Sequence, residues 1–295
     1  MRWRGRRQSE NVEDRRGMSP RAAIGGGGGA LLLIGIVIAG KVGGCDAAQI
    51  QQVVDVAQQA QQRGGIQEAP TGNGVDDEAS QFVKVILADT EEVWATLFRE
   101  DLDGLDYPEP ALILFPDSVR TEGCGTGRAS MGPFYCPADK KIYVPPSFFG
   151  ELAKRHNAPG DFAQAYVIAH EVSHHVQNVL GLNRQLRSAQ EGSNRREINQ
   201  QSVRLELQAD YLAGVWAHHA QKQFDILEDG DIEEAINAAR QIGDDQLQLE
   251  SLGRTVPEHY THGTSAQRMR WFRRGMQSGN LNECLKLAEL PYSDL

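Results

Sequence analysis

The chain has 295 residues, of which 40% are hydrophobic, so it is long enough for one large domain or two small domains with a sizeable core. Its formal net charge is -10, but the first 21 residues carry seven arginines against three acidic residues, a net charge of about +4. The remainder is therefore acidic, near -14. This balance argues against nucleic acid as a partner, because phosphate binding requires clustered Lys and Arg on the folded surface.

An uncharged apolar stretch, residues 22–40, follows the basic N-terminus and has about the length needed to cross the hydrocarbon core of a membrane. Arginines precede it and only Lys41 follows closely, so the positive-inside rule places the N-terminus in the cytoplasm. We therefore predict a basic cytoplasmic segment over 1–21, an uncleaved single-pass anchor in the inner or plasma membrane, and a periplasmic or extracellular domain. A cleaved signal peptide and a lipoprotein-type cleavage box at Val42–Cys45 are the alternatives.

The four cysteines contain no CxxC pair, which argues against a cysteine zinc site. Cys124 and Cys136 lie close together in a Gly- and Pro-rich stretch. If the domain is exported, these two residues are expected to form a disulfide that closes a short loop. Two free thiols are the alternative.

The first predicted elements follow a flexible Gln- and Gly-rich linker over 41–76, which contains at most a weak helix at 48–62. Folded sequence begins near Asp77, where apolar residues at helical spacing predict a helix over 79–100. The apolar run ALILF at 111–115 predicts a strand. Residues 132–145 predict two short strands around a Pro-Ala-Asp turn.

The second half of the chain is predicted to be helical. Asp161 is a good N-cap and Gly181 a good C-terminal stop for the central helix. Further helices are predicted at 204–220, 231–243 and 264–279. The expected fold class is therefore α+β and mostly helical, in one domain over 77–295, with a small antiparallel sheet before the central helix.

The sequence His170-Glu171-Val172-Ser173-His174 lies within the central helix. Residues four apart share one face of a helix, so His170 and His174 can direct two imidazoles at one cation. Glu171 is rotated by about 100° and can act as a general base without being a ligand. A helix with incidental histidines is the alternative, but the apolar flanks favour a buried helix whose histidine edge faces a cleft. His175 is off this face and is expected to be a satisfied or exposed histidine.

A catalytic zinc requires three protein ligands and one open position. A third histidine in the long form H-E-x-x-H-x-x-G-x-x-H is excluded, because Gln177 and Leu180 occupy the glycine and histidine positions. The next helix supplies carboxylates in the sequence LELQAD. We expect Glu206 to be the third ligand, and Asp210 to accept a hydrogen bond from the second ring nitrogen of a zinc-bound histidine. A solvated helix face is the alternative for both carboxylates.

Several stretches together resemble the neutral zinc metallopeptidase family of bacteria. They are MRWRGRRQSENVEDRRG with the apolar segment after it, GPFYCPADKKIYVPPSFFGEL, APGDFAQAYVIAHEVSHHVQNVLG, ELQADYLAGVWAHHA and THGTSAQRMRWFRRG. The resemblance covers nearly the whole chain. More distantly, HExxH followed by ExxAD resembles the glutamate-zincins, which include membrane-bound CAAX-type proteases and thermolysin-like enzymes.

The resemblance implies a zincin-like metalloprotease domain on one membrane anchor, with Glu171 as the general base. It implies that Zn²⁺ is bound by His170, His174 and Glu206.

In related proteases, a histidine-containing segment after the third ligand helps to bind the substrate carbonyl. The sequence THGTSAQR could place His262 or Arg268 in that catalytic role. Gly263 departs from the pattern, because the membrane-bound relatives more often have proline at this position.

We therefore predict a membrane-anchored zinc metalloendopeptidase, a hydrolase that acts on proteins or peptides. Zinc would make a water molecule acidic near neutral pH, and Glu171 would take its proton and deliver it to the leaving amine. The strand near Lys140 to Val144 could pair with an extended substrate by edge addition, or be simple core structure.

Two readings from other functional classes stay open. One is a membrane-anchored binding or scaffold protein with a non-catalytic zinc site, and the other is a signalling or assembly role of the helical region 221–295. A purely structural zinc site would not need Glu171, so the sequence favours an enzyme.

Overall fold

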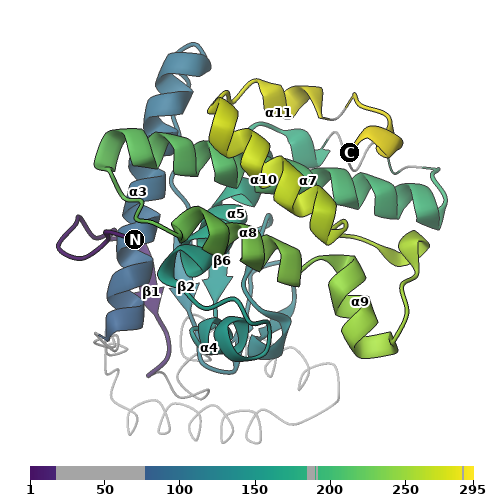
Figure 1. The fold of residues 1–295 in the computed structure, drawn as a ribbon. Helices are drawn as coiled ribbons and strands as arrows, with labels where there is room; N and C mark the ends of the chain where they lie inside the picture. Colours follow the sequence, from purple (N-terminus) through teal and green to yellow (C-terminus); the bar gives the residue numbers. More distant parts are fainter. Residues whose placement is uncertain (18–76, 185–189, 191, 288) are drawn as a thin grey trace, which may run out of the picture. The chain divides into compact units, whose positions relative to one another are not determined.

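The computed structural model describes residues 1–17, 77–184, 190, 192–287 and 289–295 (Figure 1). One compact unit is formed by Met1–Glu13 together with the chain from residue 76 to Leu295. The linker and the apolar stretch 22–40 lie outside the described residues, as does the weak helix at 48–62, so these stay predictions. Within the described ranges, no helix is both long and apolar enough to cross a membrane.

The first helix of the domain, α3 (Glu78–Asp101), begins where the sequence predicts. Asp77 caps it, because its side chain accepts a hydrogen bond from the Ser80 backbone N–H at 2.9 Å. Its apolar face, which includes Phe82, Ile86 and Trp94, is fully or almost fully buried. This face packs against α5 (Asp161–Val179) and α7 (Arg195–Phe224).

A four-stranded sheet lies beside these helices in the order β1-β2-β6-β5. The strands β5 (Phe134–Cys136) and β6 (Lys141–Val144) are antiparallel and flank the expected turn. In contrast, β2 (Ala111–Leu114) pairs with β6 in parallel, so the prediction of an antiparallel sheet was wrong for this pair. The chain between them contains a separate antiparallel hairpin and β5, and this long connection lets it return in the same direction.

The separate hairpin is formed by β3 (Ser118–Arg120) and β4 (Thr126–Arg128). Cys124, in the turn between these strands, is bonded to Cys136 of β5, with a Cα–Cα distance of 5.9 Å. The predicted disulfide is confirmed, and it ties the hairpin to the sheet. Among the described cysteines, Cys284 is free and buried.

The remaining helices cover the second half of the chain, as predicted for 231–243 and 264–279. The central helix α5 begins at Asp161 and its N-cap is Gly160 with φ 122°, so Asp161 is the first helical residue rather than the expected cap. Helix α7 begins nine residues before the predicted start, where its polar first turns lack apolar periodicity but Asn194 provides a capping box. The other helices are α4 (Ser147–Lys154), α8 (Asp231–Gln241), α9 (Asp244–Leu252), α10 (Ser265–Ser278) and α11 (Glu283–Lys286), with short 3₁₀ turns at Ala129–Met131, Pro257–His259 and Tyr292–Asp294.

The N-terminal residues are part of this folded unit. Met1 and Trp3 are buried in the core, and β1 (Val12–Asp14) is the outer neighbour of β2. The sequence analysis assigns residues 1–21 to a basic segment separate from the domain. For Met1–Glu13 the contacts correct this assignment, because arginines that look like a solvated charge run are ion-paired with the domain.

Helices α7 and α10 cross with their backbones almost in contact (Figure 1). A Cβ atom on Gly214 would lie 2.2 Å from the Phe272 carbonyl oxygen, and one on Gly275 would lie 1.9 Å from the Tyr211 carbonyl oxygen. Only glycine permits this approach. The crossing fixes α10 against the part of α7 that carries Glu206 and Asp210.

We expect Gly275→Ala to force α10 away from α7 and to lower the free energy of unfolding by about 1–3 kcal/mol, the usual cost of overpacking. The measurement is urea unfolding of the full chain. Gly150→Ala is the matched control, because Gly150 also lies in a helix but a Cβ there meets no atom within 4 Å. Equal unfolding midpoints for the two variants would contradict the close crossing.

Candidate metal centre

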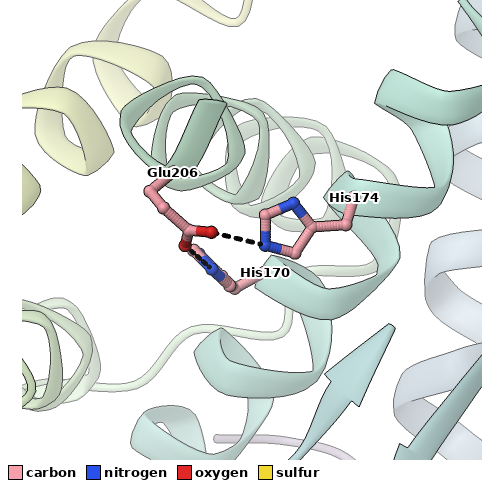
Figure 2. Close-up of side chains that lie close together, drawn as sticks. All are labelled: His170, His174 and Glu206. Atoms are coloured by element: carbon pink, nitrogen blue, oxygen red, sulfur yellow. Dashed lines mark hydrogen bonds and ion pairs between the residues drawn. The ribbon is translucent and has the colours of Figure 1, made fainter. Parts of the chain in front are cut away.

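Two helices bring three metal-ligating side chains together. One turn of α5 presents His170 and His174, and α7 presents Glu206 between the two rings (Figure 2). The Nε2 atom of His170 lies 3.1 Å from Glu206 Oε2, and the Nε2 atom of His174 lies 3.5 Å from Glu206 Oε1. The structure therefore places the three expected ligands at one point.

The outer nitrogen of each imidazole, Nδ1, also has a hydrogen-bond partner. His170 Nδ1 is 2.9 Å from Asp210 Oδ1, the contact expected for Asp210, and His174 Nδ1 is 2.8 Å from Gln177 Oε1. Because both partners are oxygens, each Nδ1 carries the proton and each Nε2 is left as the atom that can bind a cation. Gln177 is in turn fixed by donating to the Leu205 carbonyl at 2.7 Å.

Asp210 is fully buried among three donors. Arg268 donates to its two oxygens at 2.8 and 3.0 Å, and the Tyr166 hydroxyl donates to Oδ1 at 2.5 Å. Arg268 also donates to the Ile242 carbonyl. Its guanidinium lies 3.4 Å from His170 Nδ1, whereas Glu206 contacts the other ring nitrogen, and Arg268 lines the same cavity as the three candidate ligands. We interpret Arg268 as a positioning residue, in place of the substrate donor that the sequence analysis offers.

The pKa values show how strongly this cluster attracts positive charge. Burial alone would raise the pKa of Glu206, but the charge on His174 and hydrogen bonds from both rings hold it well below its usual range. Burial opposes protonation of His174, yet Glu206 raises its pKa to about 9. Burial likewise opposes ionisation of Asp210, and Arg268 and His170 lower its pKa to about 2.

The donor set fits a zinc ion. Two neutral imidazoles and one carboxylate converge from one side, and this is the ligand type and number of a catalytic zinc site. The three ligand atoms lie within 4.8 Å of one another. A cation placed among them would be attracted by the Glu206 carboxylate, the same charge that raises the pKa of the His174 ring. The buried partners of the outer nitrogens complete the fit.

A cavity of about 510 Å³ opens onto this cluster. Glu171 lines it together with the ligands, and its side chain is almost completely buried, so it stands where a general base is expected. The opposite wall is formed by the segment that leads into β5, with Gly132, Pro133 and Phe134, and by Phe148 of α4.

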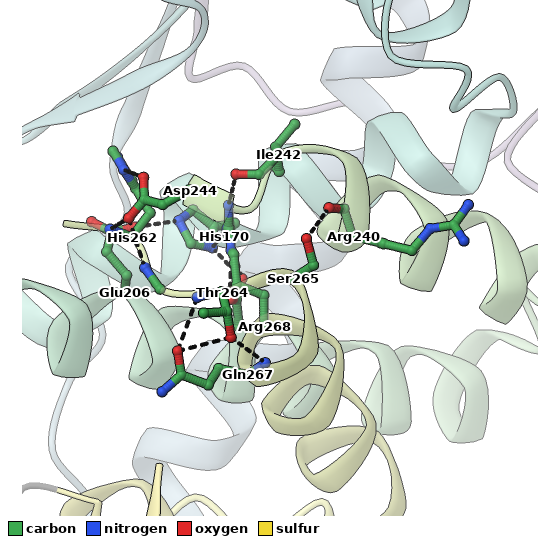
Figure 3. Close-up of polar contacts among 12 residues, drawn as sticks. His170, Glu206, Arg240, Ile242, Asp244, His262, Thr264, Ser265, Gln267 and Arg268 are labelled. Carbon is green, nitrogen blue, oxygen red and sulfur yellow. Dashed lines mark hydrogen bonds and ion pairs between the residues drawn. The ribbon is translucent and has the colours of Figure 1, made fainter. Parts of the chain in front are cut away.

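His262 lines the same cavity and its side chain is about half exposed. Its loop is fastened by Asp244, whose Oδ2 accepts backbone N–H groups of residues 261, 262 and 263 at 2.6, 2.6 and 3.0 Å (Figure 3). Burial opposes protonation of His262, but Asp244 and Glu206 raise its pKa. His262 is therefore the better placed of the two donors suggested by the sequence.

Several important residues were missed by the sequence analysis. Tyr166 lies four residues before His170 on the same helical face, and Gln177 lies three residues after His174, so helical spacing could have found both. Asp244 is 18 residues from His262 and follows no local pattern, so only the fold identifies it. His175 is satisfied, as expected, by Tyr135 and the Pro108 carbonyl.

The comparison with known proteins agrees with this centre. Residues 1–287 match the family described as "Putative neutral zinc metallopeptidase". The chain belongs to this family. The protein YpfJ of Escherichia coli (strain K12) is 47% identical over 292 residues, which cover 96% of this chain and 98% of that protein. The protein Rv2575 of Mycobacterium tuberculosis (strain H37Rv) is 42% identical over 217 residues, which cover 70% of this chain and 71% of that protein. No solved structure matches the chain.

We expect Tyr166→Phe to weaken zinc binding by about tenfold, because loss of a hydroxyl that orients the partner of a ligand usually costs 10–100-fold in metal affinity. Competition with a chromogenic chelator measures the affinity. Tyr211→Phe is the control, since it also removes a hydroxyl, but one bonded to Ser278 and the Asn280 carbonyl away from the centre. Equal affinities of the two variants would show that Asp210 does not act through His170.

Proposed function

We propose that this chain is a zinc-dependent endopeptidase that hydrolyses peptide bonds in proteins or peptides. The observation that carries the proposal is the convergence of His170, His174 and Glu206 at a cavity that Glu171 also lines. A binding site alone would not need a carboxylate beside the ligands. Membership of a metallopeptidase family supports the same reading.

Zinc bound by the three ligands would supply a Lewis acid that makes water more acidic and polarises a peptide carbonyl. Glu171 follows His170 on α5 and is held by the same helical turn, so its carboxylate reaches the cavity without competing as a ligand. It would take the proton of the attacking water and then deliver it to the leaving amine.

His262 would donate a hydrogen bond to the oxyanion that forms when the carbonyl is attacked. Its raised pKa favours the protonated ring that such a donor needs, and Asp244 orients the ring by a contact of 3.2 Å between Oδ1 and Nδ1. The catalytic constellation is then Glu171 and His262, with Arg268 acting only through Asp210.

An extended substrate would bind along β5. For the strand near Lys140 to Val144, the sequence leaves open edge pairing with a substrate or simple core structure. Because β6 lies between β2 and β5, its edges are occupied and it is core structure. The strand β5 is the edge of the sheet, and its residues Phe134 and Tyr135 line the cavity. Edge addition would deliver a peptide bond to the metal centre.

We further propose that the enzyme works at a membrane and outside the cytoplasm. The disulfide between Cys124 and Cys136 supports an oxidising compartment. The apolar stretch 22–40 supports attachment to a membrane.

We expect Glu171→Gln to keep its zinc but to lose about 10²–10⁴-fold in the rate of peptide hydrolysis, the usual contribution of a general base. Glu206→Gln should lose zinc as well as activity. The measurements are metal content by atomic spectroscopy and cleavage of labelled unfolded casein by the full chain.

Glu250→Gln is the control for these variants, because Glu250 is an exposed carboxylate on α9 outside the cavity. It should match the parent chain in both measurements. Zinc bound without cleavage by the parent chain, or with equal cleavage by parent and Glu171→Gln, would favour a binding or scaffold protein instead.

A further inference from the structure

The α-ammonium group of Met1 is buried in a carboxylate site. It lies 2.8 Å from Asp161 Oδ1, 3.1 Å from Glu228 Oε2 and 3.3 Å from Asp231 Oδ1. Asp161 begins α5, the helix that carries the two histidines, and Asp231 begins α8. Three carboxylates from two regions of the chain thus converge on one positive charge.

The carboxylates around Met1 favour a free, positively charged amine at this position. The N-terminal end of a helix carries partial positive charge, so two helix starts would repel a cation unless carboxylates outweigh them. Asp161, Asp231 and Glu234 also form the second acidic cluster of the described chain that has the spacing of a metal site. With Met1 in place, the cation of this cluster is an ammonium group. A neutral, acylated or displaced N-terminus would leave the buried Asp231 carboxylate without its cation.

The residues after Met1 continue this docking along the domain. The Arg2 backbone N–H donates to the Ile226 carbonyl at 2.8 Å, and its side chain donates to the Asp225 and Leu227 carbonyls. Trp3 is buried, with its ring 5.3 Å from that of Phe82 in an edge-on contact. Backbone, apolar and charged contacts therefore act together.

The N-terminal tail, residues 1–13, then runs along α3. Arg6 donates to Asp89 at 2.6 Å, Arg7 to Glu91 at 2.9 Å, and Ser9 to Glu91 at 2.5 Å. Asp89 and Glu91 are each only 2% exposed, so they need these partners. The Asn11 carbonyl finally accepts from the Leu112 backbone N–H at 2.8 Å, which joins the tail to the sheet.

We propose that Asp161, Glu228 and Asp231 form a binding site for the α-ammonium group of Met1, and that this docking keeps residues 1–13 and 77–295 on the same side of a membrane. Cleavage of a leader before residue 77 would remove the ligand of this site and β1 with it.

The contacts restrict the membrane topology. Residues 1–13 touch the domain directly, while the hydrocarbon core of a membrane is about 30 Å thick. An odd number of crossings between Gly17 and Asp77 would place the two parts on opposite sides. The cytoplasmic N-terminus with an external domain, expected from the arginines, is incompatible with the docked tail. The arginines that suggested it are bound to Asp89, Glu91 and Asp225.

The first test measures protection of the Met1 amine in the full chain. Acylation by an N-hydroxysuccinimide ester at pH 7 is followed by mass spectrometry of the N-terminal peptide. We expect the native amine to react at least about tenfold more slowly than the same amine in denaturant, since it must leave two or three charge-assisted hydrogen bonds. Equal rates would overturn the proposal.

Variants separate the site from general stability. Asp231→Asn should speed acylation about tenfold, because the amine loses a buried charged partner, whereas Glu233→Gln, an exposed neighbour in the same helical turn, should not. A Gly-Ser extension before Met1 should increase trypsin cleavage after Arg6. An extended chain as resistant as the native one would contradict a role for the amine, even if Asp231→Asn failed to fold.

The second test concerns topology in cells. Gln8→Cys reports on the exposed tail and Arg254→Cys on the exposed domain, each in a chain with Cys45→Ser. An impermeant maleimide applied to intact cells and to inverted vesicles should label both positions from the same side. Labelling from opposite sides would overturn the proposal.

The docked amine also predicts a dependence of stability on pH. Burial opposes its charge, but the hydrogen bonds that it donates to Asp161 and Glu228 raise its pKa from 8.0 to about 10. A raised folded pKa stabilises the fold fully below pH 8 and less as the pH rises to 10. The native chain should therefore lose more thermal stability than the Gly-Ser-extended chain between pH 8 and pH 10, measured by differential scanning fluorimetry. Parallel profiles would show that the amine is not held.

Discussion

The metal centre depends on one buried carboxylate. Asp210 is fully buried and binds Arg268, Tyr166 and His170 at once. Removing one partner of a buried ion pair costs about 3–5 kcal/mol, so this carboxylate cannot move without loss of the fold. Asp210 holds the His170 ring so that the Nε2 atom of the ring faces Glu206. Asp210 and Glu206 lie one turn apart on α7. Ligand and support are therefore fixed by the same helix.

The glycine crossing explains why Arg268 reaches Asp210. Gly214 and Gly275 let the α7 and α10 backbones touch, which brings the start of α10 alongside the carboxylate. The loop before α10 is fastened independently, because Asp244 binds three successive backbone N–H groups there. Consequently the backbone of the loop that carries His262 into the cavity is held in place, and this suits the proposed role of an oxyanion donor.

The sequence analysis succeeded where the signal is local. Helical spacing put His170 and His174 on one face, the carboxylates of the next helix offered Glu206, and turn residues placed β5 and β6. It failed where the partner is distant in sequence: the parallel pairing of β2 with β6, the Asp244 contacts and the role of Arg268 all join segments that local periodicity cannot relate. The N-terminal arginines were interpreted as a membrane-topology signal, because their carboxylate partners lie more than 70 residues later in the sequence.

Charge pairs thus join distant segments at two places, at the start of α5 and beside His170 on the same helix. The Met1 ammonium joins the starts of α5 and α8, and Arg268 joins α10 to α7 beside His170. Since the position of α5 depends on its first turn, the N-terminal residue is physically linked to the two histidines, which lie about 2.5 and 3.6 turns later. A chain that began at Asp77 would leave Asp161 and Asp231 as like charges without a cation. The N-terminal residues therefore belong to the framework around the candidate metal centre, and the family match includes them from residue 1 onward.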